Sequence, residues 1–355
     1  MTKLQTIIGI SLFLILFTSC DEEKKDFATF TFKENLAIPF NSEVEIEIEP
    51  LVENLKSIEL EIDDKIVSKW DNPRKNKLKF TLNSKELGIG AKGVNLIAKA
   101  KNGEIFRDER IVRVLSDLKP ELWTYEVLST SPHNIANFTQ GFEFSDNQLY
   151  EATGQKGESK IAKIDLKTGL DINKIGLDAT HFGEGITILG DTIYQLTWTT
   201  NKCFLYNKNT LEILPQDFTY QGEGWGLCND GKQIIMSDGT ERLTFRNPKT
   251  FAIEKTIEVY THEQPVIRLN ELEYINGFVF ANIWMTNNIA VIEPETGRVI
   301  GVIDGSSLVT IGRGQIGEVF NGIAFNKQED AIYLTGKNWE KIIKIRLKKD
   351  TDQLQ

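Results

Sequence analysis

A short phrase recurs five times across the last two-thirds of this 355-residue chain. Its second residues stand at positions 140, 184, 225, 270 and 321, so successive copies are 44, 41, 45 and 51 residues apart. The copies are Thr139–Phe142, Gly183–Ile186, Gly224–Leu227, Leu269–Leu272 and Phe320–Ile323, each followed by a β-type run. A period of about 45 residues with several short strands per unit predicts an all-β fold, a five-bladed β-propeller whose equivalent residues converge on one axis.

A second periodic phrase supports five blades. It reads as the turn between the third and fourth strands of a blade, and its copies are Asp165–Thr168, Asn207–Thr210, Asn247–Thr250 and Glu293–Thr296. The fifth repeat has no such turn. We therefore predict that Leu122–Val127, which precedes the first repeat, supplies the outer strand of the fifth blade and removes a free sheet edge. The propeller is expected over residues 118–350.

Residues 27–117 do not share the repeat. Apolar and polar residues alternate there in several short runs, such as Val44–Ile48 and Ile58–Ile62, and Asn102–Gly103 predicts a hairpin turn. Regularly spaced short strands over such a length predict a small immunoglobulin-like β-sandwich. The region carries no chemical motif, so a spacer or docking module is the expected role.

The N-terminal segment has the features of an export signal. Lys3 gives a positive start, and the apolar run Ile7–Phe17 is too short to span a bilayer. The end of the run resembles a bacterial lipoprotein signal, with Cys20 as the lipidated residue. We expect a signal peptide over 1–19, a charged tether over 20–26, a tail over 351–355 and anchoring to a bacterial membrane, periplasmic or at the cell surface. The alternative is an ordinary secretory signal.

The net charge, the histidines and the cysteines exclude few classes of function. The net charge of −10 argues against nucleic acid as a partner. The three histidines show no metal-ligand spacing, so no metal site is predicted. Cys203 and Cys228 fall in equivalent regions of neighbouring repeats, and the sequence leaves open whether they pair.

Propeller geometry brings unlike residues to one mouth of the channel. The repeated phrase opens the innermost strand of each blade, and the second strand returns antiparallel to end at the same mouth. The residues expected there are Gln140, Glu184, Trp225, Asn270 and Asn321, interleaved with Trp198, Trp284 and Lys337. Tryptophans of a propeller often belong to its core, but amides, a carboxylate and an amine at symmetry-related positions are what a binding site needs.

Nine motifs carry a family resemblance over about residues 120–348. They are Phe138–Gly141, Phe182–Gly185, Gln195–Trp198, Gly222–Leu227, Ser237–Gly239, Asn270–Tyr274, Ala281–Trp284, Asn321–Ala324 and Thr335–Trp339. In this order and spacing they resemble the plant and bacterial glutaminyl-peptide cyclotransferases, five-bladed propellers unrelated to the zinc-dependent animal enzymes.

The resemblance implies cyclisation of the N-terminal glutamine of peptides or proteins to pyroglutamate, an acyl transfer that releases ammonia. It implies catalytic roles for Glu184, as acid and base, Lys337, which stabilises negative charge, and Asn270. The residues expected to bind substrate are Gln140, Trp198, Trp225, Glu271, Trp284 and Asn321, with Glu271 holding the substrate ammonium. No cofactor is required, a structural calcium ion is compatible with the family, and a monomer is expected.

Two other classes of function compete with this one. A non-catalytic propeller would hold a peptide or glycan at the same mouth without changing it. A calcium-dependent hydrolase such as a lactonase would need several carboxylates and amides around the axis, a requirement that Glu184, Asn270 and Asn321 meet only in part.

Overall fold

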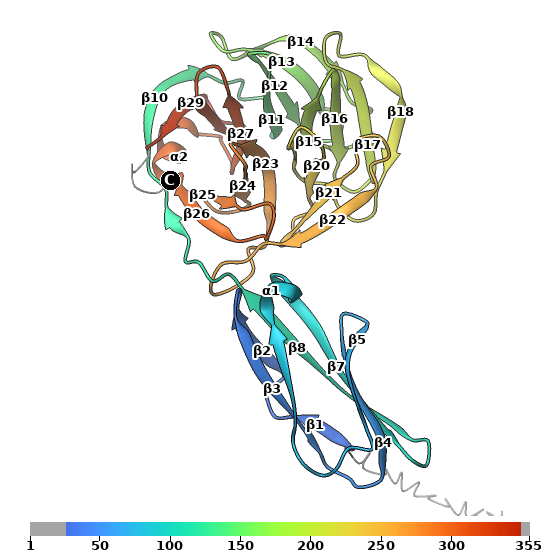
Figure 1. Cartoon of the computed structure of the whole chain (residues 1–355). Helices are drawn as coiled ribbons and strands as arrows, with labels where there is room; N and C mark the ends of the chain where they lie inside the picture. Colours follow the sequence, from blue (N-terminus) through green and yellow to red (C-terminus); the bar gives the residue numbers. More distant parts are fainter. Residues whose placement is uncertain (1–25, 349–355) are drawn as a thin grey trace, which may run out of the picture.

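The computed structural model describes residues 26–348 of the chain. The predicted signal peptide, Cys20, the tether up to residue 25 and the tail over 351–355 lie outside the described residues. Within the described part the fold is all-β, with two parts that follow one another along the chain (Figure 1). No helix among these residues is long and apolar enough to cross a membrane.

The first part consists of two packed sheets. One contains β1 (Ala28–Phe30), β3 (Glu43–Pro50) and β6 (Leu78–Asn83), and the other has the order β2 (Asn35–Pro39), β8 (Ile105–Leu115), β7 (Gly90–Ala100), β4 (Leu55–Ile62) and β5 (Lys65–Asp71). A short helix α1 (Ser84–Leu87) follows β6. The alternation in the sequence is reproduced, because every second residue, such as Ile46 and Ile48, is buried in one shared core. The predicted hairpin at Asn102–Gly103 joins β7 and β8.

The second part is built from sheets of four consecutive antiparallel strands. In residues 139–304 the sheets are β11–β14 (Thr139–Ser145, Gln148–Thr153, Lys160–Asp165, Leu170–Gly176), β15–β18 (Gly183–Leu189, Thr192–Thr197, Lys202–Asn207, Ile213–Thr219), β19–β22 (Leu227–Asn229, Ile234–Ser237, Arg242–Arg246, Ile253–Glu258) and β23–β26 (Leu269–Ile275, Phe278–Ile283, Asn288–Ile292, Val299–Asp304). Helix α2 (Ser306–Gly312) precedes a last sheet of β27–β29 (Phe320–Asn326, Ala331–Gly336, Lys341–Leu347). All four predicted strand-connecting turns lie between the third and fourth strands of their sheets.

The first strands of these sheets form a closed ring, because β11, β15, β19, β23 and β27 each contact the next and β27 returns to β11. This arrangement is β-propeller-like (Figure 1). A segment from before the first repeat closes the ring as predicted, but its bounds differ. The outer partner of β29 is β10 (Tyr125–Pro132), whereas β9 (Glu121–Leu122) pairs with β26 of the preceding sheet. Trp123 separates the two strands by packing edge-on against Phe280, at 6.0 Å between ring centroids.

Buried carboxylates hold the ring together at its centre. The carboxylate of Glu271 on β23 accepts hydrogen bonds from the backbone N–H of Phe142 on β11 (3.1 Å) and of Ile323 on β27 (2.8 Å). Glu143 on β11 accepts one from Ile188 on β15 at 3.0 Å. Burial raises the pKa of Glu271 well above its usual range, and raises that of Glu143 to about 8. These groups link strands of different sheets, and burial favours their protonated forms.

The raised pKa of Glu143 predicts a loss of stability with rising pH. The folded protein keeps a proton that the unfolded chain releases near its ordinary pKa of about 4.5, so the contribution is complete below that pH and disappears as pH approaches about 8. We expect Glu143→Gln, which mimics the protonated group, to flatten the decline by a few kcal/mol, roughly 1.4 per pKa unit. Urea unfolding at pH of about 5 and about 8 measures it. The exposed Glu212→Gln is the control, and an unchanged slope in Glu143→Gln contradicts the assignment.

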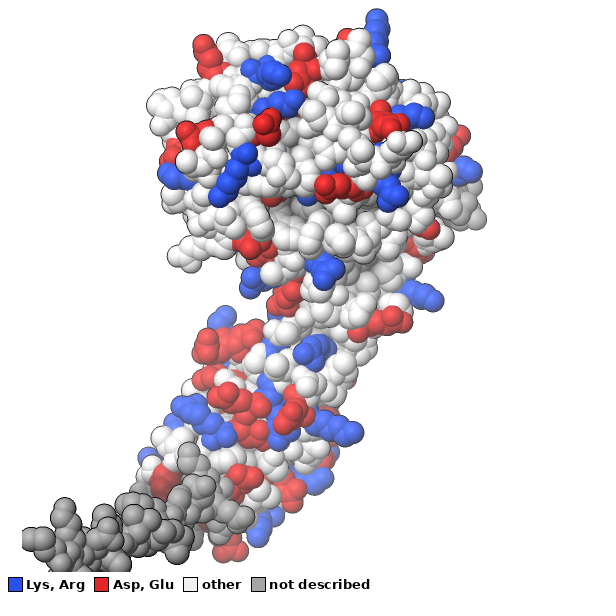
Figure 2. Space-filling view, turned by 180° about the vertical axis from the view of Figure 1, so that it is seen from behind, with Lys and Arg blue, Asp and Glu red and all other residues white. Residues whose placement is uncertain are grey.

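The two parts of the molecule meet through a small set of specific contacts. Arg298, on the turn between β25 and β26, donates to Asp117 at 3.1 Å, and Glu258 accepts from the backbone N–H of Ala91 at 3.1 Å. Tyr260 is buried with the core of the first part. Figure 2 shows charges of both signs interspersed over the elongated first part, without a broad basic area on the face in view. Mixed charge of this kind serves solubility.

Candidate functional site

A cavity of about 330 Å³ lies at the mouth of the ring where the first strands begin. It gathers seven of the nine site residues predicted in this part of the chain, namely Gln140, Glu184, Trp198, Trp225, Asn270, Trp284 and Lys337. The other lining residues are Phe138, Gln155, Phe182, Met285, Glu318 and Val319. The structure does not bring Glu271 or Asn321 to the cavity wall.

A β-bulge at the repeated phrase explains how these side chains reach the mouth. In β11, β15, β23 and β27 the pairing with the second strand shifts by one residue at the phrase, so the second residue falls out of register. In the third copy β19 begins only at Leu227, the last residue of the phrase. A bulge re-aims a side chain and is common beside active sites. The bulge therefore turns Gln140, Glu184 and Asn270 towards the mouth, whereas Asn321 at the fourth bulge lies behind Gln140.

Glu184 is the central ionisable group of the cavity. Its side chain is 5% exposed, and its Oε1 accepts a hydrogen bond from Nε2 of Gln140 at 3.0 Å. Burial raises the pKa of Glu184 well above its usual range, Lys337 opposes the rise, and Glu223 adds to it. Asn321 stands behind this pair, because its Nδ2 donates to the backbone oxygen of Thr139 at 3.0 Å and reaches Oε1 of Gln140 at 3.5 Å.

Lys337 follows directly after β28 and is also buried. Its Nζ lies 4.6 Å from the centre of the Phe138 ring, a cation–π contact. Burial lowers the pKa of Lys337, although Glu184 and Glu318 counteract the effect. Burial thus raises the pKa of the carboxyl group and lowers the pKa of the amine. Two ionisable groups with such shifted pKa values in one cavity are suited to proton transfer.

Aromatic rings form the walls of the cavity. Trp225 and Trp284 meet edge to face at 5.5 Å between centroids, and Phe182 and Trp198 at 5.7 Å. Two glycines at the ends of second strands make room for the rings. A Cβ on Gly154 would lie 2.4 Å from Phe182, and one on Gly239 would lie 2.5 Å from Trp225. The tryptophans therefore face the cavity instead of filling the core between sheets.

Asn270 offers an unused hydrogen-bond acceptor to the cavity. The residue is 2% exposed, and its Oδ1 has no partner among the described residues. A buried acceptor without a partner is costly, and a bound ligand that donates a hydrogen bond removes the cost. Its neighbour Glu271 points to the ring centre instead, where both carboxylate oxygens accept backbone hydrogen bonds. The expected contact of Glu271 with a substrate ammonium finds no counterpart in this arrangement.

Sequence reasoning missed Glu223. One carboxylate oxygen of Glu223 accepts hydrogen bonds from the indole N–H of Trp198 at 2.7 Å and of Trp225 at 2.9 Å. The signal was present in the sequence, because Glu223 stands between two glycines as Glu184 does. Glu223 does not occupy the second position of a repeated phrase, so comparing the copies did not single it out.

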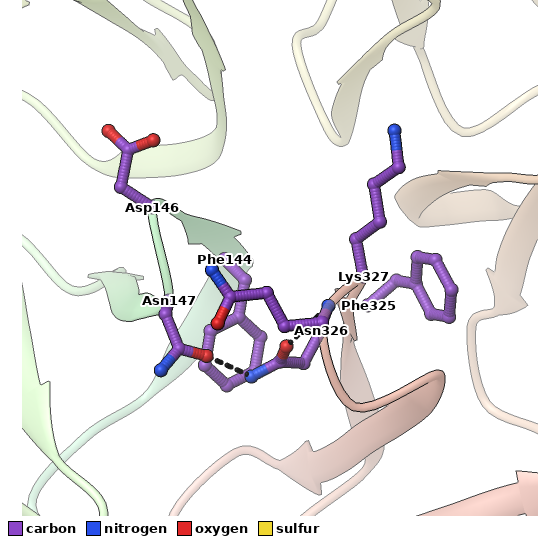
Figure 3. Close-up of a pocket in the computed structure, with 7 residues that line it drawn as sticks. Phe144, Asp146, Asn147, Phe325, Asn326 and Lys327 are labelled. Atoms are coloured by element: carbon purple, nitrogen blue, oxygen red, sulfur yellow. Dashed lines mark hydrogen bonds between the residues drawn. The ribbon is translucent and has the colours of Figure 1, made fainter.

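A second cavity of about 390 Å³ lies at the opposite end of the ring, between the β11–β12 and β27–β28 turns (Figure 3). Its buried polar residue is Asn326, which donates to Asn147 at 2.7 Å and accepts from the backbone N–H of Gln328 at 3.0 Å. Asp146 is paired with Lys208 at 2.6 Å. These polar groups are already engaged with one another, so the cavity is larger but offers less chemistry than the one around Glu184.

Metal ligation and disulfide formation receive no support from the described residues. Within 26–348 no group of three or more His, Cys, Asp or Glu side chains is arranged to hold a metal ion. At the ring centre both oxygens of Glu271 accept backbone hydrogen bonds, whereas Oε2 of Glu143 has no hydrogen-bond partner among the described residues. Cys203 and Cys228 are buried free thiols.

Comparison with known proteins gives the family. Residues 103–347 match the family model described as glutamine cyclotransferase. Over 236 residues, 65% of this chain and 74% of the relative, the sequence is 38% identical to a glutaminyl-peptide cyclotransferase of Arabidopsis thaliana. The crystal structure of Myxococcus xanthus glutaminyl cyclase matches with a TM-score of 0.61 and 34% identity, covering 64% of this chain and 98% of that one. The chain therefore belongs to the glutamine cyclotransferase family.

Proposed function

We propose that the protein is a glutaminyl-peptide cyclotransferase, which converts the N-terminal glutamine of peptides or proteins to pyroglutamate and releases ammonia. The relatives from Arabidopsis thaliana and Myxococcus xanthus are named for this activity. The observation that carries the proposal is the buried carboxyl of Glu184 in an aromatic-walled cavity beside an amine and two amides. The reaction transfers an acyl group from ammonia to the α-amine, so the enzyme is an acyltransferase that acts on its substrate's own nitrogen.

The chemistry requires one bond to form and one to break. The free α-amine attacks Cδ of the glutamine side chain to give a tetrahedral oxyanion, and the bond from Cδ to the amide nitrogen then breaks. The attacking nitrogen loses a proton and the departing nitrogen gains one, so ammonia leaves. A single carboxylate that accepts the first proton and returns it to the leaving group completes the cycle without a cofactor.

The residues of the cavity match these needs. Glu184 is proposed as the proton shuttle, and Lys337 as the cation that stabilises the oxyanion. Gln140, held by Asn321, keeps Glu184 in place. The free Oδ1 of Asn270 accepts a hydrogen bond from the substrate amine or amide, and Trp198, Trp225 and Trp284 fold the substrate back on itself. We assign Glu271 to the ring centre and not to the substrate.

A non-catalytic binding propeller is the alternative, and incubation with a glutamine-initiated dipeptide separates the two. We expect stoichiometric release of ammonia and a product that lacks a free α-amine. Saturable binding with the dipeptide recovered unchanged after long incubation overturns the proposal. The same assay with a chelator present distinguishes the calcium-dependent hydrolase, whose activity requires the ion.

The fold of both parts is included in the proposal. We propose that residues 118–350 form a five-bladed β-propeller, supported by the closed ring of first strands. Residues 27–117 are proposed as an immunoglobulin-like sandwich, supported by two packed sheets around one core. The family model begins at residue 103, so it does not explain most of this first part. We also propose that the protein is a monomer.

We further propose that Cys20 carries a lipid that anchors the protein to a bacterial membrane. The described chain begins at the end of the first part that lies far from the ring (Figure 1). Anchoring at Cys20 would therefore let the sandwich hold the cavity away from the bilayer. Cys20→Ser is expected to abolish lipid labelling and to release the protein from the membrane fraction, with the buried Cys203→Ser as control. Unchanged membrane association of Cys20→Ser contradicts the anchor.

A further inference from the structure

Glu223 joins two walls of the cavity that come from different sheets. Trp198 follows β16, and Trp225 precedes β19, yet both indoles donate to the same carboxylate oxygen, at 2.7 and 2.9 Å. Charge-assisted hydrogen bonds are stronger than neutral ones. We propose that Glu223 is a positioning residue of the cyclisation site, which fixes the facing indoles of Trp198 and Trp225 at the spacing that the substrate requires. This inference rests on the proposed function.

The backbone around Glu223 is held so that its carboxylate stays at this place. Gly224 donates from its backbone N–H to the backbone oxygen of Trp198 at 3.0 Å. The side-chain amide of Asn201 donates to the backbone oxygen of Gly222. Both contacts fasten the turn that carries Glu223 to the loop that follows β16. The carboxylate is therefore presented by a fixed turn, although it is exposed to solvent.

Trp198 has few other restraints, whereas Trp225 also packs against Trp284. Trp198 is 41% exposed, and its ring packs edge to face against Phe182. A ring with a free face can rotate about its side-chain torsions, whereas a hydrogen bond at Nε1 fixes the ring plane. A substrate that must fold back on itself binds more tightly to walls that are already in place, because less conformational freedom is lost when it binds.

Glu223 also adds negative charge beside Glu184. The ionisable groups coupled to Glu184 or lining its cavity are Lys337, Glu223, Tyr220 and Glu318, and Arg268 lies over the ring of Trp284 in the cavity wall. Among them Lys337 lowers the pKa of Glu184 and Glu223 raises it. A variant that keeps the hydrogen bonds and loses the charge therefore separates the two effects of Glu223. Glutamine does this, because its side-chain oxygen accepts both indole N–H groups.

Steady-state kinetics with a glutamine-initiated dipeptide test the inference with two variants. Glu223→Ala removes the acceptor, and we expect KM to rise about tenfold with a smaller change in kcat. Glu223→Gln keeps the acceptor, so KM is expected to stay within about twofold of the wild type. Glu223→Gln also removes a negative charge that raises the pKa of Glu184. The limb of the pH–rate profile that reports Glu184 is therefore expected to move to lower pH. Gln221→Ala, an exposed neighbour on the same turn, serves as the control for local damage.

A second measurement does not depend on turnover. The near-ultraviolet circular dichroism of the tryptophans is expected to weaken in Glu223→Ala and to persist in Glu223→Gln, with equal thermal midpoints. An unchanged KM and spectrum in Glu223→Ala overturn the inference, and so does a KM in Glu223→Gln as high as in Glu223→Ala. If the wild type itself releases no ammonia, the proposed function fails, while the spectra still report whether Glu223 holds the indoles.

Discussion

Replacement of Glu184 by glutamine is expected to lower kcat for cyclisation about a thousandfold while KM changes little. The variant keeps the volume of the side chain and an acceptor for Gln140, but it cannot take a proton from the substrate amine. The wild-type carboxyl is suited to the task because burial raises its pKa well above the usual range. The rate constants and the melting temperature of both proteins measure the effect.

The matched control for Glu184 is another buried glutamate. Glu143→Gln changes a carboxyl that is also buried but lies on β11 outside the cavity. It is expected to leave kcat within about twofold of the wild type, because it neither touches substrate nor alters the cavity. Nearly full activity in Glu184→Gln would sink the assignment of Glu184 as the proton shuttle. Equal losses in both variants would show that any buried carboxyl of the ring is essential for folding.

Replacement of Lys337 by methionine is expected to lower kcat about a hundredfold. Methionine preserves much of the apolar stem against Phe138 but removes the charge that faces the developing oxyanion. A second consequence follows from electrostatics. Lys337 lowers the pKa of Glu184, so its loss raises that pKa further, and the limb of the pH–rate profile that reports Glu184 moves to higher pH.

A control exists for Lys337 as well. Lys208 is a buried lysine that pairs with Asp146 at the opposite end of the ring. Lys208→Met is expected to reduce stability without moving the pH–rate profile. A Lys337→Met enzyme with unchanged kcat contradicts the proposed oxyanion role, and a limb that moves to lower pH contradicts the electrostatic coupling of Lys337 to Glu184.

The position of the candidate site was predictable because the repeat is regular. Equivalent residues of successive copies meet at one mouth, and seven predicted side chains line the same cavity. Of the two predicted residues that do not line the cavity, Glu271 and Asn321, the first shows why. Glu271 occupies the third position of its phrase, immediately after the bulge, and there the chain alternation turns the side chain towards the ring centre. Residue order alone does not reveal a bulge, so the direction of Glu271 was not predictable.

The bounds of the closing strand and the role of Glu223 depend on contacts between residues that are far apart in the sequence. The ring of Trp123 packs against Phe280, between the end of β9 and the start of β10. The closing strand therefore begins only at Tyr125. The role of Glu223 arises from two indoles that are 27 residues apart in sequence, at 198 and 225, and that meet only after two sheets have formed. Sequence periodicity predicts the features that every repeat shares. A contact that occurs at a single place in the fold can be found only in the folded structure.

We propose that the protein releases ammonia from N-terminal glutamine in the cavity around Glu184. The most direct measurement follows ammonia and pyroglutamyl product together for the wild type and Glu184→Gln, with a glutamine-initiated peptide and its N-acetylated form. We expect equal amounts of ammonia and product from the free peptide with the wild type, almost none with Glu184→Gln, and none from the acetylated peptide. Absence of product with the folded wild-type protein, or equal rates for the two proteins, would contradict it.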